Sequence, residues 1–160
     1  MADLTGRMTE QELVRFSPLY RAACAAYERA YAPYSNFPVG AAVLAENGQI
    51  YAGCNVENAA YPEGTCAEAG ALAAMVLDGQ QRARAVLVVA GGEEPVSPCG
   101  GCRQKLREFC QPEDMEVLLA GPLSLYRGLS EGLKARFSLA ELLPQSFGPK
   151  HLDKASLHRL

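Results

Sequence analysis

The strongest constraint on the fold is the apolar run RAVLVVAGG, residues 84–92. Its centre is a continuous series of apolar, mostly β-branched side chains, and no polar residues alternate with them. A strand with one face in water shows such an alternation, whereas a strand buried on both faces does not. The run therefore predicts a central strand in a sheet that is covered on both sides.

Other apolar runs predict the rest of this sheet. Asn47-Gly48 lies between two of them, and Asn-Gly in that position is a strong hairpin signal. The runs predicted as strands are residues 39–45 (VGAAVLA), 49–56 (QIYAGCNV), 115–121 (MEVLLAG) and, as a weaker strand or a turn, 124–130 (SLYRGLS).

Capping patterns predict the helices. Thr9 and Glu12 form a capping box that opens a short helix, and Pro18 interrupts it. Ser17 is then the predicted N-cap of a helix over residues 18–32, with the proline at its first position. The later predicted helices are residues 66–78, ended by Asp78-Gly79; a helix with Ser97 as N-cap that runs to about Cys110; and a short helix within 138–148 (SLAELLPQSFG).

The order of these elements predicts a three-layer α/β/α sandwich with a mixed, roughly five-stranded sheet. The chain has 160 residues and no visible repeat or linker, which favours one domain. We expect this domain to span residues 1–150 and to be followed by a polar C-terminal tail, residues 151–160.

Charge and hydropathy exclude several classes of partner. The net charge is −3 and the isoelectric point is about 5.4, so the basic stripe of a polynucleotide binder is not expected. The basic cluster Arg103–Arg107 is balanced by Glu108 and predicts one solvated helix face. No apolar run approaches the ~18 residues of a membrane span. The N-terminus MADLTGRMTEQEL lacks the apolar core of a secretory signal, which predicts a cytoplasmic protein.

Cysteine is more abundant than histidine among the residues that commonly bind zinc. The chain contains six cysteines, and its only two histidines, His151 and His158, lie in the predicted tail. In a cytoplasmic chain, cysteines are metal ligands, catalytic residues or buried apolar residues more often than disulfides. Any metal site in the core is therefore expected to be rich in cysteine.

Three of the cysteines stand at the starts of predicted helices. Cys66 opens one helix, and Cys99 and Cys102 open the next. The positive end of a helix favours the thiolates that a metal requires. If neighbouring parallel strands deliver both helices to one edge of the sheet, the three sulfurs converge.

Three protein ligands with an open fourth position are typical of a catalytic zinc site. Zinc there lowers the pKa of water to about 7, so that hydroxide is available at neutral pH. Glu68, two residues after Cys66, is placed to relay protons between water and a substrate.

Several other interpretations of these residues remain open. Thr65 and Glu68 also match a capping box, which needs no chemistry. The Cys-x-x-Cys pair is also typical of a redox site. A structural zinc site with Cys54 or Cys110 as fourth ligand is a further possibility, although Cys110, like Cys24, is interpreted as a small apolar helix residue.

The combination of Cys-Ala-Glu and Pro-Cys-x-x-Cys is more specific than either half, and it matches the pattern of zinc nucleobase deaminases. The sequence resembles the cytidine deaminase family, in its small homotetrameric branch with three cysteine ligands. The blocks that carry this resemblance are YAPYSNFPVGAAVL, GCNVENAAYPEGTCAEAGAL, SPCGGCRQKLREF and ELLPQSFGP.

The resemblance implies roles for individual residues. Cys66, Cys99 and Cys102 are implied to bind one Zn²⁺ per subunit, and Glu68 to transfer protons. Asn55 and Glu57 are implied to hydrogen-bond the ribose, and Phe37 to pack against the nucleoside. The Cys66 N–H and the Ala67 carbonyl are implied to contact the pyrimidine. Phe147 is implied to reach the active site of a neighbouring subunit.

The implied reaction is hydrolysis of cytidine and deoxycytidine to uridine and deoxyuridine with release of ammonia, a step of pyrimidine salvage. Hydroxide attacks C4 of cytosine while Glu68 protonates N3 and then helps the amine leave, and no organic cofactor is needed. One alternative is a zinc deaminase for a related or modified cytosine nucleoside. The other is a structural zinc or redox module without catalysis.

One position departs from the family pattern. Many members with three cysteine ligands have an arginine directly after the catalytic glutamate, and here that position is Ala69. Three thiolates on Zn²⁺ carry a net charge near −1, which weakens the Lewis acid. We expect Arg103 and the two helix dipoles to offset this charge, because an arginine close to the sulfurs forms charge-assisted hydrogen bonds.

Overall fold

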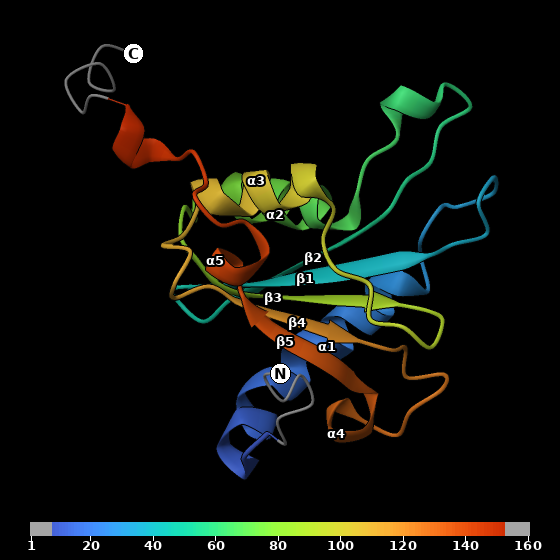
Figure 1. Ribbon diagram of the computed structural model, residues 1–160. Coiled ribbons are helices and arrows are strands. Elements are labelled where there is room, and N and C mark those ends of the chain that lie inside the picture. The colour runs from blue at the N-terminus through green and yellow to red at the C-terminus, as the bar shows by residue number, and fades with distance from the viewer. Residues whose placement is uncertain (1–7, 153–160) are drawn as a thin grey trace.

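The chain folds around one mixed sheet with helices on both faces, as a computed structural model shows (Figure 1). The structure describes residues 8–152, so most of the predicted tail, with His158, lies outside them. The elements are α1 (Glu10–Tyr27), β1 (Val39–Ala45), β2 (Ile50–Cys54), η1 (Tyr61–Glu63), α2 (Ala67–Leu77), β3 (Ala83–Ala90), α3 (Gly100–Glu108), β4 (Glu116–Ala120), α4 (Leu129–Gly132), β5 (Leu133–Ser138), α5 (Leu139–Leu142) and η2 (Pro149–His151).

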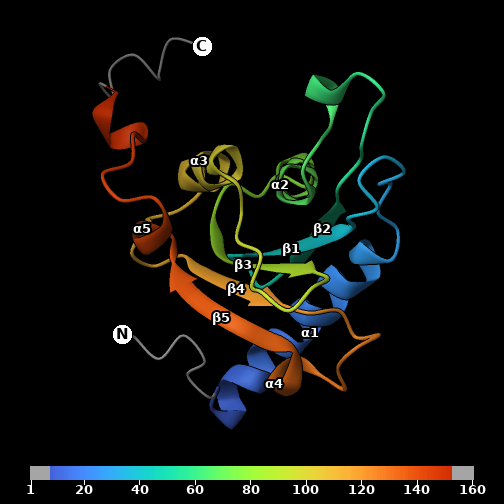
Figure 2. The ribbon, with the colours of Figure 1, turned by 45° about the vertical axis from the view of Figure 1, so that its right-hand side comes forward.

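The sheet has five strands in the order β2-β1-β3-β4-β5. Only β3 and β4 pair in parallel, and the other neighbours are antiparallel. Helices α2, α3 and α5 cover one face, and α1 and α4 cover the other (Figure 2). The predicted three-layer α/β/α sandwich with a mixed sheet is therefore confirmed. Across residues 8–152, none of the helices combines the length and apolarity that a membrane span requires.

The central strand β3 supplies both cores. Val86 and Val88 pack in the cluster beneath α2 and α3, while Leu87 and Val89 pack in the cluster that contains α1. All four side chains are at most 2% exposed. Burial on both faces is what the unbroken apolar run predicts, because neither face of this strand meets water.

Two glycines shape the β1–β2 hairpin and its contact with α2. Gly48 has a φ of +87°, which suits the predicted Asn-Gly turn. Gly53 lies on β2 where the first turn of α2 crosses it: a Cβ there would lie 2.4 Å from the Ala67 carbonyl oxygen and 2.4 Å from Ala71 N. The absence of a side chain at Gly53 thus lets α2 start close to the sheet.

The first helix differs from its prediction. The Thr9–Glu12 capping box forms as expected, but α1 then continues through Pro18 to Tyr27 instead of being interrupted. An internal proline removes one helix hydrogen bond and its ring crowds the carbonyl four residues earlier, at a cost of about 3 kcal/mol. Phe16 and Leu19, on either side of it, are fully buried against the sheet, and this packing holds the helix together.

The fifth strand was expected at residues 124–130, and this position was wrong. Residues 129–132 form the short helix α4, and the edge strand is β5, Leu133–Ser138. Lys134 and Arg136 interrupt the apolar pattern of this strand. Charged residues are common on edge strands because they block further pairing, and they also weaken the sequence signal.

An ion-pair network ties the start of α1 to β4 and β5. Arg136 Nη1 lies 2.6 Å from Glu12 Oε1, and Arg136 also pairs with Glu116. Arg15 reaches the same Glu116 at 3.1 Å. The backbone N–H of Thr9, followed by Arg136, lowers the pKa of Glu12 from 4.5 to about 2.

We expect Glu12→Gln to destabilise the protein by about 1 kcal/mol at pH 7, since glutamine keeps the cap but loses the charge. The pKa of Glu12 is lower in the folded state, so its contribution is present above the unfolded pKa of 4.5. The difference should narrow as the pH falls from about 4.5 towards 2. Urea unfolding across this range measures it, with Glu10→Gln in the same turn as control. A difference that stays constant with pH contradicts the assignment.

Candidate metal centre and active site

The sheet brings the starts of α2 and α3 to one end of the molecule. Strands β2 and β3 both pair antiparallel to β1, so they point in the same direction. Each is followed by a helix that begins beyond its carboxyl end. The prediction that the two strands run parallel is correct, but they are not neighbours, because β1 lies between them. The site therefore spans the width of β1.

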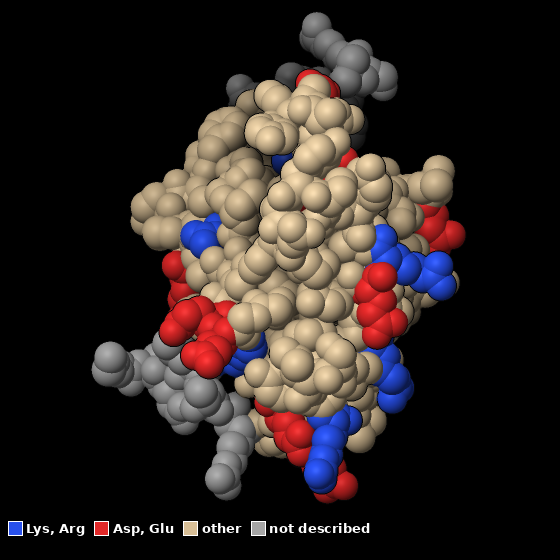
Figure 3. Space-filling model, turned by 90° about the vertical axis from the view of Figure 1, so that its right-hand side faces the viewer, with Lys and Arg blue, Asp and Glu red and all other residues tan. Residues whose placement is uncertain are grey.

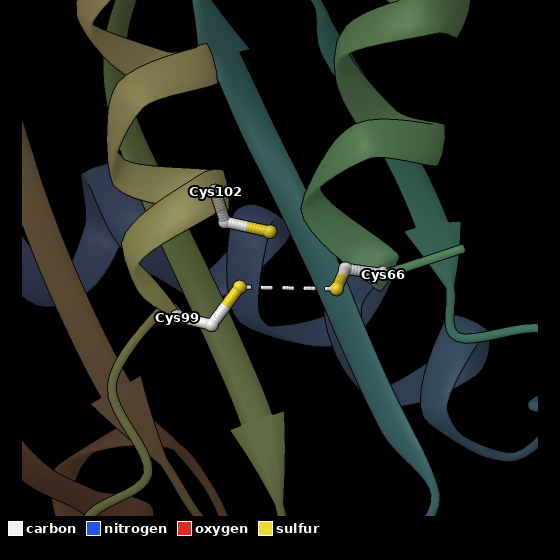
Figure 4. A group of neighbouring side chains, drawn as sticks. All are labelled: Cys66, Cys99 and Cys102. Atoms are coloured by element: carbon white, nitrogen blue, oxygen red, sulfur yellow. Dashed lines mark hydrogen bonds between the residues drawn. The ribbon is translucent and has the colours of Figure 1, made fainter. Parts of the chain in front are cut away.

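Three sulfurs converge between these helix starts. The Sγ atoms of Cys66, Cys99 and Cys102 lie within 4.8 Å of one another, and they point toward a common centre (Figure 4). Cys66 Sγ and Cys99 Sγ are 3.9 Å apart. Tetrahedral zinc with Zn–S bonds of about 2.3 Å places its sulfurs about 3.8 Å apart. The Cys66–Cys99 distance therefore matches that of two zinc ligands, and Cys102 lies close enough to be the third.

The cysteines themselves cap the helices. Cys66 is the N-cap of α2 and Cys99 is the N-cap of α3, and neither side chain forms a capping hydrogen bond. The predicted caps Thr65 and Ser97 were thus wrong. Thr65 is held in extended backbone by hydrogen bonds in both directions with Val56. The sulfurs of Cys66 and Cys99 thus stand at the positive ends of the two helices, where a metal can reach them.

Ionising the thiols of Cys66 and Cys102 is electrostatically costly, chiefly because burial removes water from them. Burial raises the pKa of the Cys102 thiol, and the nearby Glu68 carboxylate raises it further. Partial shielding from water also raises the pKa of Cys66, although its side chain reaches the surface. The pKa of Cys99 is lowered, chiefly by the backbone N–H of Cys102. A divalent cation among the sulfurs removes the cost of gathering thiolates and a carboxylate in one place.

Glu68 lies beside this cluster, next to Cys102. Its side chain is buried, and the Cys102 thiol donates a hydrogen bond to Glu68 Oε2 at 3.3 Å. The alternative role as a capping-box glutamate is contradicted, because α2 begins one residue later than that role requires. A buried carboxylate beside the metal ligands is placed to hold or move a proton.

The remaining cysteines take no part in the cluster. Cys54 Sγ donates to the Arg29 carbonyl at 3.7 Å, and Cys110 Sγ donates to the Leu106 carbonyl at 3.3 Å. A site with either of them as fourth ligand is therefore contradicted. Cys66 and Cys99 are exposed, so the cluster opens to solvent on one side. The fourth position is accessible, as a catalytic zinc site requires.

Asn55 and Glu57 lie on the loop after β2 and hold the loop that carries Phe37. Asn55 Oδ1 accepts from Val39 N at 2.7 Å, and its amide donates to the Phe37 carbonyl at 3.0 Å. Glu57 Oε2 accepts from Tyr34 N at 2.8 Å and from the following backbone N–H at 3.2 Å. A hydrogen-bonded turn at the end of the strand is the alternative role that the sequence leaves open for Asn55 and Glu57, and these contacts agree with it. Their partners, about 20 residues away, were not predicted.

A pocket of about 350 Å³ lies beside Glu57. It is lined by Tyr34, Ser35, Glu57, Asn58, Tyr61 and Gly64. A hydrogen bond from the Ser35 side chain, with backbone N–H groups, lowers the pKa of Glu57 and keeps it ionised. A larger cavity of about 470 Å³ lies at the opposite end of the sheet and contains none of the predicted site residues.

Phe147 and Ala67 occupy very different positions. Ala67 is fully buried in the first turn of α2. Phe147 is 58% exposed, stacks on His151 at 5.2 Å, and is held to α3 by a hydrogen bond from Gln104 to its carbonyl. The C-terminal segment lies on the far side of α3 from the loops near Asn55 (Figure 2). Within one chain, Phe147 is therefore remote from those loops.

The predicted solvated basic face of α3 was wrong. Arg107 is 3% exposed and donates to Ser146 Oγ and to the Cys110 carbonyl, both at 3.1 Å. Arg103 donates to Ser97 Oγ, to the Pro98 carbonyl and to the Leu142 carbonyl at 2.7, 2.7 and 2.8 Å. In the described residues, the hydrogen bonds of Arg103 thus go to oxygen atoms rather than to the sulfurs.

The chain is similar to known proteins. A family model described as the cytidine and deoxycytidylate deaminase zinc-binding region matches residues 16–118. A cytidine deaminase from Sporosarcina psychrophila is 46% identical over 131 residues, covering 82% of this chain and 90% of that protein. One from Halalkalibacterium halodurans is 41% identical over 135 residues, covering 84% of this chain and 96% of that protein.

A crystal structure agrees as well. Cytidine deaminase from Burkholderia pseudomallei superposes with a TM-score of 0.71 at 39% identity, covering 88% of this chain and 100% of that one. The matched family model is that of a zinc-binding region, and the three sulfurs gather within 4.8 Å of one another, so the cofactor is zinc. The chain belongs to the cytidine deaminase family.

Proposed function

We propose that the protein catalyses the zinc-dependent hydrolytic deamination of cytidine and deoxycytidine to uridine and deoxyuridine plus ammonia. The observation that carries the proposal is the triangle of three sulfurs with the buried Glu68 carboxylate 3.3 Å from one of them. The named relatives, which are cytidine deaminases, support the same reaction.

Bound by Cys66, Cys99 and Cys102, zinc supplies a Lewis acid that makes water nucleophilic at neutral pH. Glu68 takes a proton from the attacking water and gives it to N3 of the cytosine. The same carboxylate then takes the remaining proton of that water oxygen, which is now a hydroxyl group on C4, and gives it to the amino group. The C4–N bond breaks, ammonia leaves, and the C4 carbonyl of uridine forms. The burial of Glu68 supports this role, because a carboxylate shielded from bulk water exchanges protons with its neighbours in the site.

The nucleoside is proposed to lie between the cluster and the loop of Asn55. Phe37, which is 44% exposed, offers an aromatic face to the nucleoside. The Cys66 N–H and the Ala67 carbonyl are the proposed partners of the pyrimidine. Asn55 and Glu57 are the proposed partners of the ribose hydroxyls. Both backbone hydrogen bonds to Glu57 use Oε2, so the carboxylate can still accept a hydrogen bond from the sugar through its other oxygen.

We expect Glu57→Gln to raise KM for cytidine about 10-fold, the effect of losing one hydrogen bond to a charged group. Glutamine keeps an oxygen for Tyr34 N and Ser35 N but replaces the second oxygen with an amide nitrogen. The melting temperature should therefore fall only slightly, because the backbone hydrogen bonds remain and only the charge of their acceptor is lost. Glu57→Ala removes both roles and should also lower the melting temperature. An unchanged KM in the glutamine variant would show that Glu57 serves only the loop.

The domain bounds, the oligomeric state and the cellular location are also proposals. We infer a single catalytic domain over residues 1–150 that assembles as a homotetramer, in which Phe147 reaches a neighbouring active site. Exposed apolar side chains on the loops near the site support assembly, namely Tyr31, Tyr34, Phe37, Val56 and Tyr61. Few charged side chains interrupt the centre of the face in Figure 3. Six free cysteines support a reducing, cytoplasmic location and a role in pyrimidine salvage.

An ultraviolet assay on cytidine, deoxycytidine and free cytosine, with metal analysis of the same sample, tests the proposed function. We expect stoichiometric zinc and turnover of both nucleosides, with none of free cytosine because it lacks the ribose. Protein that holds zinc but releases no ammonia from any cytosine nucleoside would refute the proposal. Turnover of a modified cytosine nucleoside alone would show that the protein is a zinc deaminase with a different substrate.

A further inference from the structure

Arg103 folds back over the start of its own helix. It directly follows Cys102, and its Nε donates to the Pro98 carbonyl while its Nη2 donates to Ser97 Oγ, both at 2.7 Å. Ser97 and Pro98 directly precede Cys99. The side chain therefore closes a short ring of chain, residues 97–103, that contains both cysteines of α3.

A third hydrogen bond anchors the guanidinium to a different element. Its Nη1 donates to the carbonyl of Leu142, the last residue of α5, at 2.8 Å. The three bonds use all three nitrogens in three directions. Only the planar fork of arginine offers this arrangement, because a lysine carries its charge on one nitrogen. The carbonyls and the hydroxyl thus recognise the shape of Arg103 as well as its charge.

The segment before Cys99 needs such an anchor. Residues 91–99 form no helix or strand, although they connect the buried strand β3 to α3. Cys99 is exposed, and its sulfur must stay 3.9 Å from that of Cys66 on the other helix. Movement of the segment would carry Cys99 away from the triangle.

We propose that Arg103 is a positioning residue of the metal centre: it fixes residues 97–98 and thereby holds Cys99 in place, which slows the release of zinc. This inference rests on the proposed zinc site but not on the deamination reaction. It also replaces the expectation that Arg103 acts by donating charge-assisted hydrogen bonds to the sulfurs. A lysine at position 103 distinguishes the two roles. It keeps the positive charge, but it cannot form the three hydrogen bonds in three directions.

The experiment measures the release of zinc from the loaded protein into an excess of a chromogenic chelator. We expect Arg103→Lys and Arg103→Gln to release zinc about 10-fold faster than the wild type, the usual effect of losing a partner that orients a ligand. Arg107→Lys is the matched control. Arg107 lies one turn further along α3 and anchors Ser146, but it makes no hydrogen bond to residues 97–98.

The melting temperatures of the metal-free proteins separate positioning from general stability. We expect Arg107→Lys to lower the melting temperature, because Arg107 is buried, and to release zinc at the wild-type rate. If release from both lysine variants instead follows the melting temperature, Arg103 has no specific role and the proposal fails.

The two Arg103 variants distinguish geometry from charge. Release at the wild-type rate by Arg103→Lys, with fast release by Arg103→Gln, would show that charge suffices and would overturn the proposal. Wild-type rates in both would also overturn it. If neither variant folds, Ser97→Ala decides: it removes one of the three hydrogen bonds and should release zinc about threefold faster. An unchanged rate in Ser97→Ala overturns the proposal.

The outcome is separable from the fate of the proposed function. Zinc release needs no substrate, and a parallel assay of the wild type on cytidine reports the reaction by itself. A wild type that binds zinc without deaminating cytidine refutes the reaction and leaves Arg103 as proposed if the release rates agree. A wild type that takes up no zinc refutes both.

Discussion

Replacement of Glu68 by Gln should lower kcat for cytidine by about 10²- to 10⁴-fold, the range that general acid–base catalysis contributes. Glutamine has nearly the same shape as glutamate, but it can neither take the proton of the attacking water nor give one to N3. Zinc content should remain one ion per chain, because the three sulfurs are untouched. Steady-state kinetics with metal analysis of the same sample measures both.

Glu63→Gln is the matched control for this variant. Glu63 lies in η1 just before α2 and is exposed, so its replacement should leave kcat at the wild-type value. The expected KM of Glu68→Gln is close to that of the wild type, since the ribose partners are unchanged. A Glu68→Gln enzyme that keeps wild-type kcat would remove Glu68 from the reaction, and loss of zinc would make it a structural residue.

Replacement of Cys99 by Ala should weaken zinc binding by more than about 100-fold and abolish deamination. Loss of a residue that only orients a metal ligand costs about 10- to 100-fold in affinity, and loss of a ligand itself costs more. Cys99 is exposed, so the change leaves no large cavity and the chain should still fold. Competition with a chelator of known affinity measures the loss, and circular dichroism reports the fold.

Cys54→Ala provides the comparison. Cys54 lies on β2 and donates to the Arg29 carbonyl, away from the cluster. This variant should bind zinc with wild-type affinity, which shows that the loss in Cys99→Ala is specific to the site. Equal zinc affinity in Cys99→Ala and the wild type would contradict the assignment of Cys99 as a ligand.

The sequence predicts most of the sheet because burial and turns leave local signals. β3 is continuous and apolar since both of its faces are buried, and Gly48 marks the hairpin since its turn requires a positive φ. The errors arise where tertiary contacts override a local signal. Packing of Phe16 and Leu19 carries α1 through Pro18, and the charged residues of β5 hide an edge strand.

The composition of the metal site was predictable, but its supports were not. The spacing of Cys66, Cys99 and Cys102 indicates metal ligands, because the only two histidines of the chain lie near its C-terminus and cannot be expected in the core. Arg103 gave no local sign that it reaches Leu142, which lies 39 residues away. Hydrogen bonds between distant segments depend on the fold as a whole, so no short motif encodes them.

The position of β1 has a consequence for how the protein folds. Strand β1 pairs locally with β2 and over a long distance with β3, and the zinc ligands are divided between the helices that follow these two partners. We therefore expect Cys66 to belong to a unit that forms early and Cys99 to join it only when β3 docks, because that step has a greater loop-closure cost. Zinc binds all three only after this docking and so stabilises the native topology by mass action. The ion is thus expected to stabilise the docked arrangement of β3 in addition to its role in the reaction.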